Sequence, residues 1–438
     1  MATHSANRDP RLLRWQRVRE FAVPPTMIES ATVRRRTGDW AGACAAARLD
    51  VDLDLKAAAR THGRALVEQL RADLRRLAPD LLRWHLPRTA PNGLLRAGLT
   101  IPLARYAGTG RDGRSPVHLV VRTPPAWADG GQRISLALWS DDTDAGPHPH
   151  PRPSRRYRLD LHRHLWDADR AGELGARGGD DAAQPVHPAL PPGLPCAVDR
   201  WAAEARILLA ADGLPAGPVA VRLGGRHRLV LDSDGTPAPG PTDGLPVLPD
   251  AATWTPPDVE LLRTGLIEAD RLHPLVAAAL APGHVPAARV RRPDGPRFVD
   301  CRGSRHQIGL VDGVLAALDH DPEELRREEL LVGLGGPPLP CLRAIDLTHK
   351  SPAGLDGVRE LLDHGDTAGA LAVVEELLGP AAVLRDGPLR DELDAAAQRR
   401  IAYGLYRAGL AGGHCPPGHC PSGKPRPRGH RPHPRHTH

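Results

Sequence analysis

Apolar residues recur at helical spacing through the first part of this chain. In one stretch they are separated by four, four and three positions, which places them on a single face of a helix. The residues with this spacing are Leu66, Leu70, Leu74 and Leu77. The pattern predicts a helical N-terminal region over residues 1–90, with a long amphipathic helix from about Asp54 to Leu77.

The middle region, residues 91–250, has the pattern of short strands. Pro/Gly-rich stretches at 141–156 and 175–195 predict long loops between them, with a helix from about Arg200 to Ala211. A Gly-Gly pair at 224–225 permits the positive φ angles of a tight hairpin turn. Four segments alternate or run apolar as strands do: Val117 to Thr123, Ile134 to Trp139, Val219 to Leu223 and Arg228 to Leu231.

The region 251–412 begins with helical periodicity from Asp258 to about Leu280. A β-meander follows, and helical spacing then continues from Pro322 to Leu410. The expected meander strands are Ala288 to Arg291, Arg297 to Cys301 and Gln307 to Val311, with a turn at Pro293-Asp294-Gly295. Together the three regions predict an α+β fold, followed by a disordered tail at 413–438 that is rich in His, Cys, Pro and Arg.

One internal repeat links the first and last helical regions. Residues 38–45 (GDWAGACA) match residues 365–372 (GDTAGALA) at six of eight positions. In each copy Gly is placed to end one helix and Asp to cap the next. Both segments resemble the turn and second helix of a tetratricopeptide-type hairpin, without the aromatic and Pro pattern of that repeat. Since a solenoid needs about three stacked repeats, two isolated α-hairpins are expected, and common helix punctuation is the alternative.

The basic character of the chain comes almost entirely from its tail. The formal net charge is +6, and residues 413–438 supply five of these charges. Residues 1–412 are therefore nearly neutral, which argues against nucleic-acid binding except for weak contact through the tail. Lys occurs at only three positions, so nearly all 58 basic residues are Arg, a bias typical of a high-GC genome.

Hydropathy and cysteine usage indicate a cytoplasmic protein. No run of 18 uncharged apolar residues occurs, so neither a membrane span nor a signal peptide is expected. The six cysteines are few for 438 residues and suggest reduced thiols in place of a disulfide framework.

Most catalytic and nucleotide-binding motifs are absent from the sequence. The only Lys-Ser pair, Lys350-Ser351, lacks the glycines of a phosphate-binding loop, and no Gly-x-Ser-x-Gly or His-Glu-x-x-His motif occurs. A helix-turn-helix over Asp39 to Arg60 would place three acidic residues, at 50, 52 and 54, where DNA phosphates lie. These exclusions disfavour known nucleotide-dependent enzymes and DNA-binding proteins.

The best catalytic candidates surround the predicted meander. A Cys nucleophile needs a nearby imidazole, and that imidazole needs a carboxylate to orient it. The residues of these types are Cys301, His306, Asp300, Asp312 and His320. They would suit a hydrolase or transferase. Against this, strand alternation places Asp300 and Cys301 on opposite faces, and Cys is among the most often buried residue types.

Two groups of residues are candidate metal ligands. In the tail, the ligand types preferred by Zn²⁺ occur within seven residues, at His414, Cys415, His419 and Cys420. A second group, on the loop near 141–150, offers harder ligands without a rigid frame: Asp141, Asp142, Asp144, His148 and His150. For the tail the alternative is a low-complexity extension, and for the loop it is a solvated acidic turn.

A non-catalytic interaction or accessory protein is the function that these exclusions leave. Its helical hairpins would offer apolar grooves to a protein partner. The two alternatives are an enzyme that uses Cys301 with His306, and a metal-binding protein that acts through the tail.

Overall fold

The computed structural model has an α+β architecture, as the sequence predicts. Apart from isolated positions at 190 and 321–340, the described residues are 9–108, 115–141, 148–178, 194–224, 227–232, 235–284, 297–301, 304–311, 314–317, 352–378 and 387–410. No helix among them is both long and apolar enough to span a bilayer. The predicted tail lies outside the described residues.

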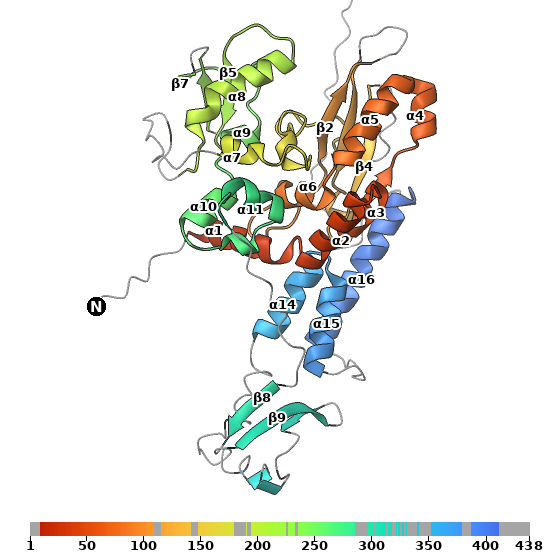
Figure 1. Cartoon of the computed structure of the whole chain (residues 1–438), viewed down its shortest axis with the longest axis vertical. Coiled ribbons are helices and arrows are strands. Elements are labelled where there is room, and N and C mark those ends of the chain that lie inside the picture. Colours follow the sequence, from red (N-terminus) through yellow and green to blue (C-terminus); the bar gives the residue numbers. More distant parts are fainter. Residues whose placement is uncertain are drawn as a thin grey trace, which may run out of the picture.

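A mixed four-stranded sheet forms the centre of the largest body (Figure 1). Its order is β1-β4-β3-β2, with β1 parallel to β4 and the other pairs antiparallel. The strands are β1 Leu49–Asp52, β2 Thr100–Tyr106, β3 Val117–Arg122 and β4 Ile134–Trp139. The bounds of β4 match the sequence prediction. The edge strands β1 and β2 were not predicted, and β1 brings the N-terminal region into the sheet.

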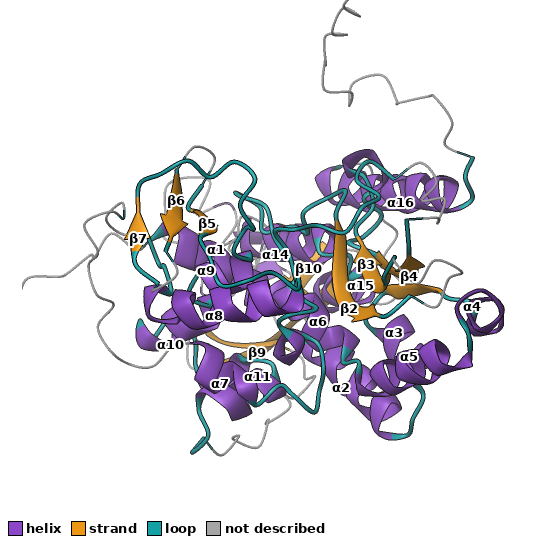
Figure 2. Ribbon diagram, turned by 90° about the horizontal axis from the view of Figure 1, so that it is seen from above, coloured by secondary structure: helices purple, strands orange, loops and turns teal. Residues whose placement is uncertain are grey.

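Helices from the N-terminal region cover one face of this sheet. Figure 2 shows α2, α3 and α5 on that side. The helices are α1 Pro10–Phe21, α2 Pro25–Arg36, α3 Trp40–Ala46, α4 Leu55–His62, α5 Arg64–Arg76 and α6 Pro79–His85. Of the predicted leucines, Leu66, Leu70 and Leu74 lie on α5 and Leu77 caps its end, and all four are buried in the core that includes the sheet. The single long helix expected from Asp54 to Leu77 is wrong, because Gly63 takes a φ of +86° and separates α4 from α5.

Helix α16, Pro388–Arg407, lies on the other face of the sheet (Figure 2). Tyr403 on α16 donates a 2.5 Å hydrogen bond to Asp50 on β1, and Arg407 forms an ion pair with Asp52. The short helix η1, Ala126–Ala128, packs against α16 through Trp127, whose ring lies 5.6 Å from that of Tyr406. The acidic residues on β1 therefore hold a C-terminal helix in place.

A smaller body follows, with its own core around Trp201. Helix α8, Val198–Ala211, packs against an antiparallel sheet of order β5-β6-β7. The strands are β5 Val219–Arg222, β6 Arg228–Leu231 and β7 Pro237–Ala238, and α9 spans Asp250–Thr253. The predicted hairpin and the helix near 200–211 are both confirmed.

The chain between the two bodies and after the second contributes short helices. They are η2 Arg163–Leu165, α7 Glu173–Gly178, α10 Pro257–Arg263, η3 Ala269–Arg271 and α11 Pro274–Leu280. The continuous helix expected from Asp258 to Leu280 is wrong, because Gly265 adopts a φ of +66° and ends α10. Helix α10 returns to α1, where Asp258 forms a buried ion pair with Arg19 at 2.7 Å.

The internal repeat has the local structure that the sequence predicts. Gly38 and Gly365 both adopt a φ of +80°, between α2 and α3 and between α14 (Pro352–Asp363) and α15 (Thr367–Leu378). Asp39 then caps α3 by accepting a hydrogen bond from the Gly42 N–H at 2.8 Å. In the second copy Asp366 accepts one from the N–H of residue 369 at 3.2 Å. Two α-hairpins are therefore confirmed.

The meander is confirmed in its described part. Strand β8, Arg297–Cys301, pairs antiparallel with β9, Ser304–Val311, which pairs with β10, Val314–Ala317. The expected strand at 288–291 and the turn at 293–295 lie outside the described residues. This sheet lies beyond α14 and α15, away from the two larger bodies (Figure 1).

Candidate ligand-binding cleft

A cleft of about 620 Å³ lies between the four-stranded sheet and the smaller body. Three parts of the chain form it: one end of β2, β3 and β4; the segment 152–158; and the end of α8 with residues 244–247. Its lining residues are Pro102, Arg105, Pro116, His118, Trp139, Asp141, Arg152, Pro153, Ser154, Arg155, Arg158, Leu208, Asp212, Leu214, Gly244, Leu245, Pro246 and Val247. The volume is in the range of small-molecule sites.

A row of three residues across the sheet forms the floor of the cleft. Arg105 on β2 lies directly opposite His118 on β3, and His118 lies opposite Trp139 on β4. Residues that oppose one another in antiparallel strands share a face, and the His118 and Trp139 rings are 5.7 Å apart. Desolvation by burial lowers the pKa of His118, so its imidazole is neutral at neutral pH.

The segment 152–158 supplies most of the positive charge. Arg152 and Arg155 are exposed, and neither forms a hydrogen bond or ion pair with any other described residue. Ser154 fixes a turn that includes Arg155, since its hydroxyl accepts hydrogen bonds from the Arg156 and Tyr157 N–H groups at 3.2 and 3.3 Å. Its own N–H donates to the Thr100 carbonyl on β2 at 2.8 Å. Ser154 therefore ties the segment that carries the two arginines to β2, and neither guanidinium group has a partner among the described residues.

Helix α8 ends at the cleft in a Schellman motif. Gly213 has a φ of +67°, and the Leu214 N–H donates to the Leu209 carbonyl at 2.9 Å. This geometry sets Asp212 and Leu214 into the cleft wall. Asp212 accepts hydrogen bonds from Arg158 at 3.1 and 3.3 Å.

Two of the four cleft arginines have partners within the protein. Arg105 donates to the Ala211 carbonyl at the end of α8 at 3.0 Å and lies 3.9 Å from Asp212. Arg158 forms ion pairs with Asp160 and Asp212. Asp141 and Asp212 are the two acidic residues in the lining. Four arginines against two aspartates leave the cleft net positive.

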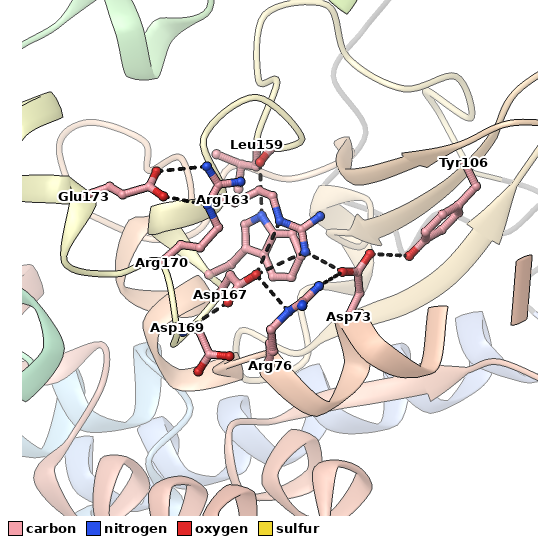
Figure 3. Close-up of polar contacts among 10 residues, drawn as sticks. Asp73, Arg76, Tyr106, Leu159, Arg163, Asp167, Asp169, Arg170 and Glu173 are labelled. Carbon is pink, nitrogen blue, oxygen red and sulfur yellow. Dashed lines mark hydrogen bonds and ion pairs between the residues drawn. The ribbon is translucent and has the colours of Figure 1, made fainter. Parts of the chain in front are cut away.

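A polar network around the buried Asp73 anchors β2, the strand that carries Arg105 of the cleft, to α5 (Figure 3). Asp73 on α5 accepts a hydrogen bond from Tyr106 on β2 at 2.8 Å and forms ion pairs with Arg76 and Arg163. Asp167, which is fully buried, also pairs with Arg163, at 3.1 Å. Tyr106 follows Arg105 along β2, so the strand presents Arg105 to the cleft while Tyr106 fixes it to α5.

The predicted catalytic residues Cys301, Asp300 and His306 lie on β8 and β9 and do not line the cleft. Cys301 lies opposite Ser304 in the β8–β9 register, and His306 lies two positions further along, opposite Val299. Cys301 and His306 thus occupy diagonal positions on one face, but the Cys301 side chain is only 1% exposed. Asp300 pairs in register with Arg305. The remaining two candidates, Asp312 and His320, lie outside the described residues.

The predicted tail ligands, His414, Cys415, His419 and Cys420, lie outside the described residues, as do Asp142 and Asp144 of the acidic loop. His148 is buried, with Nε2 3.0 Å from the Thr123 carbonyl and Nδ1 accepting from the His150 N–H. Within the described part of the chain, no three His, Cys, Asp or Glu side chains are grouped as metal ligands.

The sequence predicts a loop at 141–156, which includes Arg152 and Arg155 of the cleft, and it assigns these arginines no role. Four arginines occur in the seven residues 152–158, and this local density is a signal that could have identified the segment. The other lining residues are spread between positions 102 and 247, too far apart in the sequence for a local pattern to connect them. Comparisons with family models, with curated proteins and with solved structures found no match to this chain.

Proposed function

We propose that the protein is a non-catalytic binding protein whose ligand carries negative charge and occupies this cleft. The observation that carries the proposal is the pair Arg152 and Arg155, which line the 620 Å³ cleft and have no hydrogen bond or ion pair with any described residue. A guanidinium donates in a fork that matches carboxylate and phosphate oxygens. Because the other two arginines are already partly neutralised, these two are the groups available to a ligand.

Binding is favoured over catalysis by the chemistry of the lining. Ser154 is the nucleophile type in the lining, His118, Asp141 and Asp212 are the base types, and no hydrogen bond joins Ser154 to any of these three. The Ser154 oxygen instead accepts two backbone N–H groups. A nucleophilic serine requires an adjacent base, so we assign Ser154 a structural role in the turn.

The test is calorimetric titration of the full-length protein with inorganic pyrophosphate, a compact polyanion. We expect Arg152→Ala/Arg155→Ala to lower the affinity at least about tenfold, since hydrogen bonds to charged groups contribute about 1.5–3 kcal/mol each. The matched control is Arg60→Ala/Arg64→Ala, which removes two exposed arginines on α4 and α5 and changes net charge equally. Equal losses in both variants, or no binding to the unaltered protein, would refute the proposal.

We also propose that the protein partner expected from the sequence binds to α16. Two large apolar side chains four residues apart on this helix are exposed: Ile401 at 56% and Leu405 at 45%. Contiguous exposed apolar residues often mark protein contacts. Pull-down from lysate should return one stoichiometric partner that Ile401→Glu/Leu405→Glu no longer retains. Recovery of the chain alone would count against this second function.

A further inference from the structure

The cleft has two walls of different chemistry. The segment 152–158 forms the cationic wall. The second wall is mainly apolar, with Leu208 on α8, Leu214 just after its end, and Leu245 and Val247 from the segment after β7, although it also contains Asp212. A ligand that only carried charge would leave this second wall in contact with water.

Leu214 is the most exposed apolar residue of this wall. It occupies the position after the glycine of the Schellman motif, where an apolar side chain normally packs back on its own helix. Here Leu214 is 44% exposed, whereas Leu208, six residues earlier on α8, is 2% exposed. Because Leu214 also lines the cleft, a bound ligand can cover part of its exposed surface, and burying such area favours binding.

The size and charge distribution of the cleft also favour a ligand that carries an apolar group in addition to its anionic group. At about 620 Å³ the cleft is far larger than a phosphate or carboxylate group, and sites of this size hold drug-sized molecules. His118 on the floor adds no charge in its neutral form. Arg105 and Arg158 are partly neutralised by Asp212 and Asp160, so the positive charge available to a ligand lies at Arg152 and Arg155, and the surface around Trp139 and Leu214 can take an uncharged group.

We infer that the ligand is a small amphipathic anion, with a phosphate or carboxylate head at Arg152 and Arg155 and an apolar body against Leu214 and Trp139. This inference rests on the proposed function and specifies its ligand class. The head and the body are recognised by different walls, so each contribution can be removed separately.

The test compares four probes by calorimetry: inorganic phosphate, phenyl phosphate, benzoate and benzyl alcohol. Phenyl phosphate should bind at least about tenfold more tightly than inorganic phosphate, as expected for burying one ring of apolar surface. Benzyl alcohol, which lacks the anion, should not bind measurably. Comparison of benzoate with phenyl phosphate then identifies the head group that the arginines prefer.

Leu214→Asn should abolish most of the advantage of phenyl phosphate while leaving the affinity for phosphate unchanged. The control is Leu410→Asn, because Leu410 holds the same position in the Schellman motif that ends α16, with its N–H bonded to the Leu405 carbonyl. That variant should bind both probes as the unaltered protein does. Circular dichroism and Tm establish that both variants are folded.

The outcomes separate this inference from the proposed function. If phosphate and phenyl phosphate bind equally well, the amphipathic ligand is refuted while anion binding stands. The same conclusion follows if Leu214→Asn and Leu410→Asn behave alike. If none of the anions binds, both proposals fail together.

Discussion

Gly365 lies directly against Gly131. A Cβ atom added to Gly365 would be 2.0 Å from the Gly131 carbonyl oxygen. The turn of the second α-hairpin is therefore packed on the loop that precedes β4, and Arg48 strengthens the contact by donating to the His364 carbonyl at 2.7 Å. The corresponding glycine of the first hairpin, Gly38, has nothing within 4 Å of such a Cβ.

This difference makes the two glycines a matched pair for mutation. Both have a φ of +80°, so alanine at either position costs about 1–2 kcal/mol of backbone strain. Gly365→Ala should cost about 1–3 kcal/mol more than Gly38→Ala, because its Cβ meets a backbone oxygen that cannot move easily. Urea denaturation of the two variants measures the difference. Equal losses would show that the turn does not pack on Gly131 in solution.

The burial of His364 predicts that the packing of Gly365 on Gly131 is sensitive to acid. Its side chain is 1% exposed, and its ring nitrogens have no hydrogen bond among the described residues. Burial, with four nearby arginines, lowers the pKa of His364 to about 3. The charged groups that face it are Arg88, Arg83, Arg48, Arg17 and, at 3.7 Å, Glu360.

Because the unfolded state binds a proton near pH 6.5 and the folded state does not, the His364 contribution is complete above pH 6.5 and is lost as the pH falls toward 3. The loss should be about 1 kcal/mol per pH unit. His364→Gln should flatten the dependence of unfolding free energy on pH between 6 and 5 by that amount. Parallel curves for the variant and the unaltered protein would contradict the assignment.

The network of Figure 3 should contribute much more than a surface ion pair on the same helix. The Asp73 carboxylate is 7% exposed and forms ion pairs with Arg76 and Arg163, both of which Asp73→Asn weakens. We expect the free energy of unfolding to fall by about 2–3 kcal/mol. The control is Glu68→Gln, whose ion pair with Arg71 has the same i,i+3 spacing on α5 but is exposed. It should cost less than about 1 kcal/mol. Chemical denaturation distinguishes the two, and similar losses would mean that burial adds nothing here.

Cysteine alkylation tests the enzymatic alternative. Cys301 is buried, as are Cys44 and Cys196, whose pKa values burial raises to about 12 and about 11. Thiolates are the reactive species, so these three thiols should react with iodoacetamide more slowly at neutral pH than a free cysteine. Peptide mapping by mass spectrometry reports each rate. A Cys301 that reacted faster than free cysteine would revive the hydrolase or transferase hypothesis.

Metal titration tests the predicted zinc site of the tail. If His414, Cys415, His419 and Cys420 bind Zn²⁺, the full chain should bind one ion that a chain ending at Gly412 does not. Affinity should fall at acidic pH, since the ligands must lose protons to bind. Equal binding by both chains would remove the tail from consideration.

The sequence by itself determined the local features of this protein. The bounds of β4, β6 and β8 and the helix ends at Gly38 and Gly365 followed from alternation and from residues with special backbone preferences. These signals act over a few residues. Even locally they failed at Gly63 and Gly265, where periodicity continued through a glycine that the folded chain uses to turn.

Only the tertiary structure decided what those elements build. The parallel pairing of β1 with β4 joins residues 85 positions apart, and Asp258 reaches Arg19 across 239 positions. The cleft depends on the same kind of contact, since the segment that carries Arg152 and Arg155 lines a cleft only where it meets the four-stranded sheet and the end of α8. Such contacts are selected by packing and charge pairing between distant segments, and no local pattern of residues encodes which segments will meet.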